Sequence, residues 1–298
     1  MITVIFHCRS FSIVTFSSMT MNCNERKRQL NAELSVLPTF VPIQDCRIIR
    51  LDHRVPSFDL YNLIQRANIT NSYTIDTEKD FVTHQPALFQ IEFIGTESLV
   101  VVVQVCHLPP VGSSLLWMMQ ALFKTILTSS NKFYAWGNVK LELADFVPCG
   151  LFSCQLLDQI SDSTDVQKQF KGWYNRTFTH ECGLPSSVVN DHAVCTCPHR
   201  PMKQQNEPWS LQRTVAWTFS EFLDKTRTKS RWAQVVNHQH GIRRSDLVTQ
   251  QRKSFFDHLV LYAIDDCLSV TKLSMVIESE WSKTQLRQYN QQQHPSCC

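Results

Sequence analysis

Apolar residues are grouped along the chain in a way that predicts strands first and helices later. Three segments are rich in β-branched or aromatic side chains and predict consecutive strands over 72–78, 86–94 and 98–108. The third segment, SLVVVVQVCHL, is apolar at successive positions, as in a strand that is buried on both faces. The residues IGTE between the second and third segments predict a tight hairpin. We therefore expect these segments to form the core of a sheet.

Helical spacing of apolar residues predicts helices around this sheet. One helix is expected over 58–68, and another follows Ser113 or Ser114, either of which suits the N-cap position. NKFYAWG predicts a fourth short strand, and VKLELADF predicts the start of a further helix. The second half is mainly helical, with Ser210 as an N-cap and a long final helix over 255–280. This order indicates an α/β or α+β domain in which helices pack on a mixed sheet.

The two ends of the chain lack this regular pattern. Residues 1–47 contain the charged run NERKRQL and two prolines before any strong periodicity, so we expect a peripheral N-terminal segment there. The ordered domain is expected over 48–284. The tail over 285–298, QLRQYNQQQHPSCC, is rich in Gln and is predicted to be disordered.

Composition and charge leave several classes of protein open. With 298 residues, 43% of them hydrophobic, the chain can bury one large core or about two smaller ones. The formal net charge of +3 permits a polyanionic partner without requiring one. Twelve cysteines and the glycosylation sequons at Asn68 and Asn175 would suit a secreted, disulfide-linked glycoprotein.

The first twenty residues argue against export. They contain no basic N-terminal region, and His7 and Arg9 interrupt their apolar run. No apolar stretch reaches the roughly 20 residues that a membrane-spanning helix needs. We therefore expect an intracellular protein, nuclear or cytoplasmic, with reduced cysteines and no membrane partner. A mitochondrial presequence stays open, because acidic residues are absent before Glu25.

Acidic residues at the end of the first predicted strand are the first candidates for chemistry. Asp76 and Glu78 in SYTIDTE lie two positions apart, so both side chains project from one face of a strand. Adjacent carboxylates repel unless a cation or hydrogen-bond donors hold them. In the final helix, Tyr262 and Asp266 are four residues apart and share a helical face. An Asp facing the strand pair would complete a group of three carboxylates, whereas a solvated strand end is the alternative.

The order of these segments resembles the ribonuclease D and Werner-type 3′-5′ exonucleases, members of the DEDD superfamily. IDTE (75–78) resembles their first motif, and YAIDD (262–266) resembles the Tyr-x-x-x-Asp form of their third motif. SLQ, FLDK and SRW between them resemble the segment before that third motif. The likeness covers about 51–277, with a large insertion. It implies an α/β, ribonuclease H-like fold of three layers, with a mixed central sheet flanked by helices.

The same resemblance implies an activity and roles for the residues. The chain would be a 3′-5′ exonuclease that hydrolyses phosphodiester bonds of DNA or RNA from the 3′ end with two Mg²⁺ or Mn²⁺ ions. Asp76 and Asp266 would be direct or bridging metal ligands, and Glu78 a ligand or a water contact. Tyr262 would orient the attacking water. Asp265 is predicted to be a solvated surface carboxylate.

One departure from the family pattern concerns the second motif. It should supply an Asp at the start of a helix after the fourth strand, but in FYAWGNVKLELADF the matching residue is Glu142, and Asp145 lies nearly one turn further along. Glu142 would be an outer ligand of the second metal ion. Because Mg²⁺ requires nearly ideal octahedral geometry, the longer side chain puts full activity in doubt. The alternative function is a catalytically degenerate module that binds nucleic acid or an unidentified protein partner.

A Cys- and His-rich stretch, HECGLPSSVVNDHAVCTCPHR, lies in the expected insertion at about 178–205. It could close a tetrahedral structural Zn²⁺ site, a loop with free thiols being the alternative. The best four ligands are Cys182, Cys195, Cys197 and His199. The later stretch NHQHGIRRSD (237–246) predicts either a basic loop that contacts a nucleic-acid backbone or a solvated loop.

Overall fold

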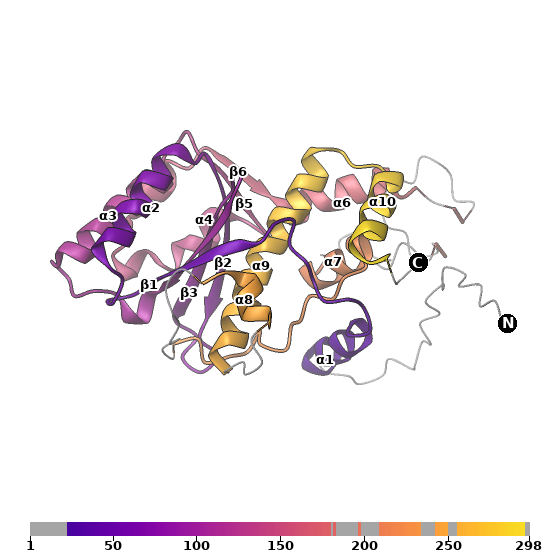
Figure 1. Cartoon of the computed structure of the whole chain (residues 1–298), viewed down its shortest axis with the longest axis horizontal. Coiled ribbons are helices and arrows are strands. Elements are labelled where there is room, and N and C mark those ends of the chain that lie inside the picture. Colours follow the sequence, from indigo (N-terminus) through magenta and orange to yellow (C-terminus); the bar gives the residue numbers. More distant parts are fainter. Residues whose placement is uncertain are drawn as a thin grey trace. The chain divides into compact units, whose positions relative to one another are not determined.

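A computed structural model provides the structure of the chain and describes residues 23–179, 181–182, 196–197, 209–233, 242–249 and 255–295. The chain divides into two compact units, whose elements Figure 1 labels. The helical unit contains Met1–Phe40, Phe170–Thr226 and Val276–Cys298. The sheet unit contains Val41–Gln169 and Arg227–Met275.

The sheet unit is built on six strands in the order β1-β4-β3-β2-β5-β6. The strands are β1 (Cys46–Leu51), β2 (Ser72–Lys79), β3 (Pro86–Phe93), β4 (Ser98–Gln104), β5 (Lys132–Ala135) and β6 (Asp162–Asp165). β3 is antiparallel to both β2 and β4, and the other neighbouring pairs are parallel. The three strands predicted over 72–108 are therefore adjacent at the centre of the sheet, and β1 and β6 form its edges.

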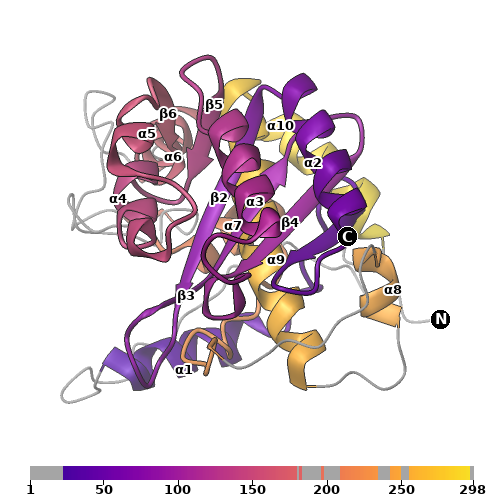
Figure 2. The ribbon, with the colours of Figure 1, turned by 90° about the vertical axis from the view of Figure 1, so that its left-hand side faces the viewer.

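One face of the sheet is covered by α2 (Ser57–Ile69) and α3 (Ser114–Ile126), as Figures 1 and 2 show. Tyr73 and Ile75 of β2 point into this apolar core. The Tyr73 ring lies 5.1 Å from the ring of Phe93 and 5.7 Å from that of Phe133, measured between centroids. The predicted N-cap of α3 is Ser113, whose side chain accepts a hydrogen bond from the backbone N–H of Leu116.

The opposite face of the sheet is covered by α9 (Phe255–Glu278). The hydroxyl groups of Thr74 on β2 and Thr271 on α9 lie 2.6 Å apart. Glu92 on β3 is only 2% exposed and accepts hydrogen bonds from Thr271 and, at 2.6 Å, from Ser98. Burial raises the pKa of Glu92 to about 7, although these two hydrogen bonds act in the opposite direction.

A mixed sheet between two helical layers confirms the predicted ribonuclease H-like α/β fold. Shorter elements complete the sheet unit: α4 (Val139–Ala144), α5 (Cys154–Asp158), α8 (Arg244–Thr249) and the 3₁₀ turns Val105–His107 and Val147–Cys149. Asn138 caps α4 by accepting a hydrogen bond from the backbone N–H of Leu141. No helix in the described ranges is long and apolar enough to cross a membrane.

An ion pair fixes α8 against α9 and corrects two predictions. The guanidinium of Arg244 donates to both carboxylate oxygens of Asp265, at 2.6 and 3.1 Å. The Arg244 and Asp265 side chains are 9% and 16% exposed. The prediction that Asp265 is solvated is therefore wrong, and Arg244 does not project as part of a basic loop. A bidentate ion pair with Arg compensates a carboxylate for the loss of its hydration, so Asp265 can be buried. The position of Asp265 in the sequence does not reveal this pairing.

The helical unit contains α1 (Cys23–Leu34), α7 (Leu211–Phe219), α10 (Lys283–Gln293) and most of α6 (Val166–Thr177). Trp209 packs against the rings of Phe170 and Tyr174, at centroid distances of 5.3 and 4.8 Å. The predicted cap of α7, Ser210, accepts a hydrogen bond from the backbone N–H of Arg213.

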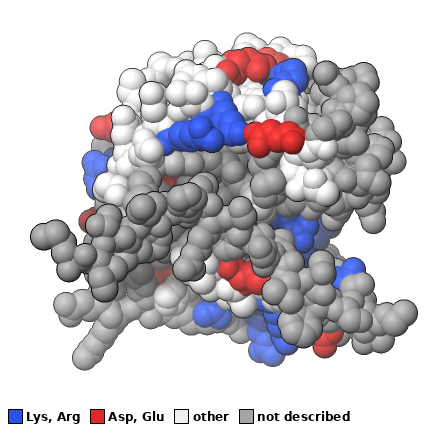
Figure 3. All heavy atoms as spheres, turned by 90° about the vertical axis from the view of Figure 1, so that its right-hand side faces the viewer, with Lys and Arg blue, Asp and Glu red and all other residues white. Residues whose placement is uncertain are grey.

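Helix α10 lies where the sequence predicted a disordered tail. Ser282 and Gln285 form a capping box at its start, and Leu286 is buried. The side-chain amide of Asn290 donates to the carbonyl of Thr218 at 3.1 Å, which anchors α10 to the end of α7. On the face that Figure 3 shows, basic and acidic side chains of the described residues lie next to one another.

Candidate active site

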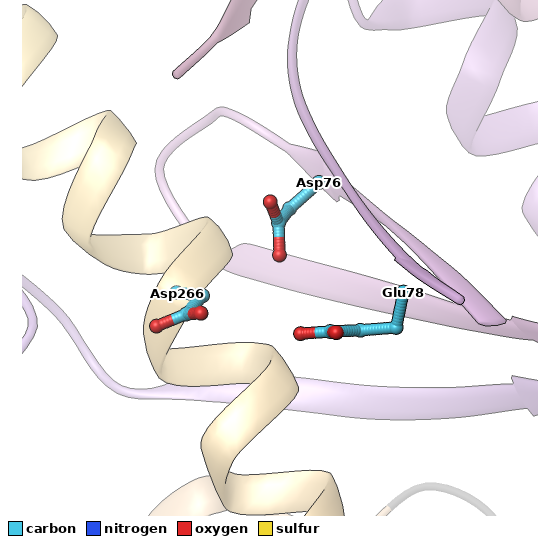
Figure 4. A group of neighbouring side chains, drawn as sticks. All are labelled: Asp76, Glu78 and Asp266. Atoms are coloured by element: carbon cyan, nitrogen blue, oxygen red, sulfur yellow. The ribbon is translucent and has the colours of Figure 1, made fainter. Parts of the chain in front are cut away.

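Three carboxylates from distant parts of the chain meet in the sheet unit. Asp76 and Glu78 come from β2 and Asp266 comes from α9, and Figure 4 shows the three side chains pointing toward one another. One oxygen of each lies within 4.8 Å of the others. Glu78 and Asp266 are buried and Asp76 is half-buried. The structure thus brings together three of the four carboxylates predicted as Mg²⁺ or Mn²⁺ ligands.

The carboxylates of β2 lie where this strand extends past one of its neighbours. β5 pairs with β2 only from Ser72 to Thr74, so the part of β2 that carries Asp76 and Glu78 extends past this neighbour. On the other side, β3 pairs along β2 as far as a register shift between Glu78 and Lys79. Irregular pairing of this kind often occurs beside functional sites, where it redirects a side chain.

The donor set suits a hard divalent cation. Carboxylate oxygens are the preferred ligands of Mg²⁺ and Mn²⁺. Two negative charges 4.8 Å apart repel by about 3.5 kcal/mol at an effective dielectric constant of about 20. A divalent cation would replace this repulsion by attraction, so the residues fit a metal ion.

Tyr262 lies one helical turn before Asp266 and is 6% exposed. Its hydroxyl group lies 2.9 Å from that of Thr228, and the Trp232 ring lies 5.7 Å from the Tyr262 ring. Burial first, and then the negative charges of Asp266 and Glu78, raise the pKa of Tyr262 well above its usual range. The phenol therefore stays protonated at neutral pH, where it can donate a hydrogen bond but cannot act as a base.

The segment 228–233 contacts Tyr262 through Thr228 and Trp232, and its last residue is hydrogen-bonded to Asp80. One carboxylate oxygen of Asp80 accepts a hydrogen bond from the backbone N–H of Ala233, and the other accepts from those of Val82 and Thr83, all at 3.0 Å. These hydrogen bonds, that from Ala233 first, lower the pKa of Asp80. Asp80 was not among the predicted site residues, and its signal in the sequence is an Asp followed by a turn after a strand.

Glu142 lies elsewhere. Its carboxylate accepts a hydrogen bond from the hydroxyl group of Thr77 at 2.7 Å. Thr77 projects from the opposite face of β2 to Asp76 and Glu78. Among the described residues, the carboxylates close enough to share a metal ion do not include Glu142. The neighbouring Asp145 forms an ion pair with Lys79.

The proposed zinc ligands are only partly described. Cys195 and His199 lie outside the described residues. Cys182 is half-buried, and Cys197 is buried in the helical unit. The Cys197 sulfur accepts a hydrogen bond from the backbone N–H of Glu181 at 3.0 Å.

Comparisons with known proteins concern the fold. No protein-family model and no curated protein matches the sequence. The EXO domain of Aedes aegypti Nibbler is similar in structure, with a TM-score of 0.49 and 12% identity over 82% of this chain and 95% of that domain. Escherichia coli RNase D, an exoribonuclease involved in structured RNA processing, gives a TM-score of 0.42 and 14% identity over 85% of this chain and 50% of that chain. Brucella melitensis NrnC with bound Mg²⁺ gives a TM-score of 0.39 and 15% identity over 85% of this chain and 88% of that chain.

Proposed function

We propose that this chain is a metal-dependent 3′-5′ exonuclease that hydrolyses phosphodiester bonds from the 3′ end of DNA or RNA. The grouping of Asp76, Glu78 and Asp266 beside the buried hydroxyl group of Tyr262 carries this proposal. The three carboxylates would hold Mg²⁺ or Mn²⁺, two ions being the usual number for this chemistry. When bound, such ions make water a stronger nucleophile near neutral pH and stabilise the leaving oxygen.

The residues of the chain supply positioning. Tyr262 keeps its proton and donates a hydrogen bond that orients the attacking water at the terminal phosphodiester. Thr228 and Trp232 limit the directions that the Tyr262 side chain can take. Asp80 binds the backbone N–H of Ala233, the residue after Trp232, and so holds that end of the segment 228–233 in place.

The test is a cleavage assay on single-stranded DNA and RNA that carry a label at the 5′ end. Purified protein with Mg²⁺ or Mn²⁺ should shorten them stepwise from the 3′ end, and EDTA should stop the reaction. Asp76→Asn should abolish cleavage, because it removes one ligand charge without changing the size of the side chain. The matched control is Asp145→Asn, an exposed carboxylate of the same unit that should leave the rate unchanged. Full activity of Asp76→Asn, or no shortening by folded wild-type protein, would contradict the proposal.

A second candidate function rests on the position of Glu142. Its hydrogen bond to Thr77, away from the three carboxylates, favours a degenerate module that binds nucleic acid or a protein partner without cutting. In that case the wild-type protein would bind an oligonucleotide but not shorten it in either metal.

We also propose a structural Zn²⁺ bound by Cys182, Cys195, Cys197 and His199. The hydrogen bond from Glu181 to the Cys197 sulfur supports it, because backbone N–H donors stabilise a thiolate ligand. Elemental analysis of purified protein should find about one zinc per chain, and Cys197→Ser should lose it. Zinc-free protein with unchanged thermal stability would reject this site.

A further inference from the structure

An exposed aromatic side chain follows the carboxylates on the same segment of chain. Phe81 lies three residues beyond Glu78 and is 47% exposed. Its backbone N–H donates to the carbonyl of Ser230 at 3.0 Å, and the adjacent Asp80 accepts hydrogen bonds from two residues of the following turn. His84 completes this turn with a φ of 58°. The Phe81 ring is thus presented to solvent on a loop that several hydrogen bonds hold in place.

One basic side chain lies over this ring, and a second lies on the same segment of chain. The ammonium group of Lys229 lies 5.4 Å from the centroid of the Phe81 ring, within the range of a cation–π contact. The His84 ring approaches Phe81 edge-on, at 6.5 Å between centroids. Lys229 and Arg231 are exposed and flank Ser230, the residue that binds the Phe81 backbone. Phe81, His84, Lys229 and Arg231 are called the Phe81 surface below.

The Phe81 surface and the carboxylates are joined by one short segment. Thr228 and Trp232 contact Tyr262, while Ser230 between them binds Phe81. Three residues of extended chain span at most about 11 Å, so the Phe81 backbone lies no further than this from the Glu78 backbone. About three stacked nucleotides, at a rise of about 3.4 Å each, span the same distance. The exposed ring is therefore within reach of the last few nucleotides of a strand that has its 3′ end at the carboxylates.

An exposed aromatic ring among basic side chains matches the way in which proteins bind single strands. Unpaired bases stack on aromatic rings while Lys and Arg contact the phosphates. In a duplex, the faces of the bases are covered by their neighbours and cannot stack on a protein ring. We propose that the Phe81 surface binds an unpaired base upstream of the 3′ end, so that the protein acts on ends that are single-stranded over about three nucleotides. This inference rests on the proposed exonuclease function for the placement of the 3′ end.

Binding without cleavage tests the surface. Fluorescence anisotropy in EDTA would measure the affinity for a single strand of about 12 nucleotides, a length within known single-strand site sizes. Phe81→Ala should weaken binding by about 5- to 150-fold, and Phe81→Trp, which keeps a stacking ring, should retain the wild-type affinity. The matched control is Trp117→Ala, an aromatic residue of α3 that is 63% exposed and should not affect binding. Lys229→Gln should make the dependence of the binding constant on salt concentration less steep, by the amount that corresponds to about one phosphate contact.

Abasic nucleotides locate the stacked base. Replacing one base at a time near the 3′ end should identify a position at which the wild-type protein loses as much affinity as Phe81→Ala does. At that position Phe81→Ala should lose nothing further, because the two changes remove the same contact. On a blunt duplex, Phe81→Ala and wild-type protein should bind equally. Three results would overturn the inference. They are a loss of wild-type affinity that is the same at every abasic position, a loss of affinity of Phe81→Ala for the duplex as large as for the single strand, and an unchanged affinity of Phe81→Ala for the single strand.

The two proposals fail in different ways. If wild-type protein shortens the strand but Phe81→Ala binds as tightly as wild type, the surface is refuted and the exonuclease stands. If the wild-type protein does not cut, but Phe81→Ala weakens binding only where a base is present, the surface is supported and the exonuclease is refuted. No binding of any oligonucleotide by wild-type protein would refute the surface.

Discussion

Asp266→Asn should stabilise the protein in the absence of metal and remove its response to divalent cations. The Asp266 carboxylate is 4% exposed and faces two others, so in EDTA its charge opposes folding. An Asn amide has nearly the same size and can donate hydrogen bonds to Asp76 and Glu78. The variant therefore replaces a repulsion by an attraction without leaving a cavity.

The magnitude follows from the geometry of the three carboxylates. Each neighbour within 4.8 Å contributes about 3.5 kcal/mol of repulsion at an effective dielectric constant of about 20. Solvent screens the half-buried Asp76, so we expect a net gain of about 2 kcal/mol in the free energy of unfolding. For a chain of this size, that corresponds to an increase in Tm of about 3 °C. Wild-type protein should instead gain about 2.7 kcal/mol when Mg²⁺ or Mn²⁺ is present at a hundredfold excess over Kd.

Thermal unfolding followed by circular dichroism, in EDTA and over a titration of each metal, would measure both effects. Asp145→Asn is the control, because that carboxylate is about half exposed and forms a surface ion pair with Lys79. Its free energy of unfolding in EDTA should differ from that of wild type by no more than about 1 kcal/mol. Its Tm should rise with added metal as much as that of wild type does. A wild-type Tm that ignores both metals, or an Asp266→Asn variant less stable than wild type in EDTA, would refute the reasoning.

Three further outcomes follow from the described contacts. Tyr262→Phe should lower kcat by on the order of 100-fold with little change in KM, and because the pKa of Tyr262 is raised, wild-type kcat should show no loss from phenol ionisation up to about pH 10. Arg244→Met should destabilise the fold by about 3–5 kcal/mol in urea unfolding, and adding Asp265→Leu should restore most of it; no restoration would show that the pair does not act as a unit. The raised pKa of Glu92, about 7 in the folded state, means that folding favours the protonated form. Wild-type stability should therefore fall as pH rises from about 4.5 to 7, and Glu92→Gln should remove this fall; an unchanged pH profile would contradict it.

The parts of the fold that were predictable have strong local patterns. β2, β3 and β4 are rich in β-branched and aromatic residues, and α9 carries apolar residues over most of its 24 positions. β6, with the sequence DSTD, has no apolar pattern and is defined only by its pairing with β5. Helix α10 did carry a signal, the capping box of Ser282 and Gln285, which its many Gln residues obscured.

In the candidate site, too, the predictable residues are those with a local pattern in the sequence. The spacing of Asp76 from Glu78, and of Tyr262 from Asp266, fixes which side chains share a face, so their convergence could be predicted. The role of Asp80 depends on residue 233 approaching across the fold, and no local spacing encodes that approach. Glu142 could be aligned with a motif, but its contact with Thr77 depends on the packing of α4 beside β2.

The two adjacent aspartates of α9 give this helix a fixed rotational setting. Consecutive residues of an α-helix project about 100° apart, so Asp265 and Asp266 address different neighbours. The two hydrogen bonds from Arg244 to Asp265 resist rotation of α9 about its axis, and they thereby fix the direction in which Asp266 points. Asp265 therefore orients the Asp266 carboxylate through the helix. A scan of variants for activity should therefore find position 265 sensitive, although its carboxylate binds Arg244 and is not one of the three that converge.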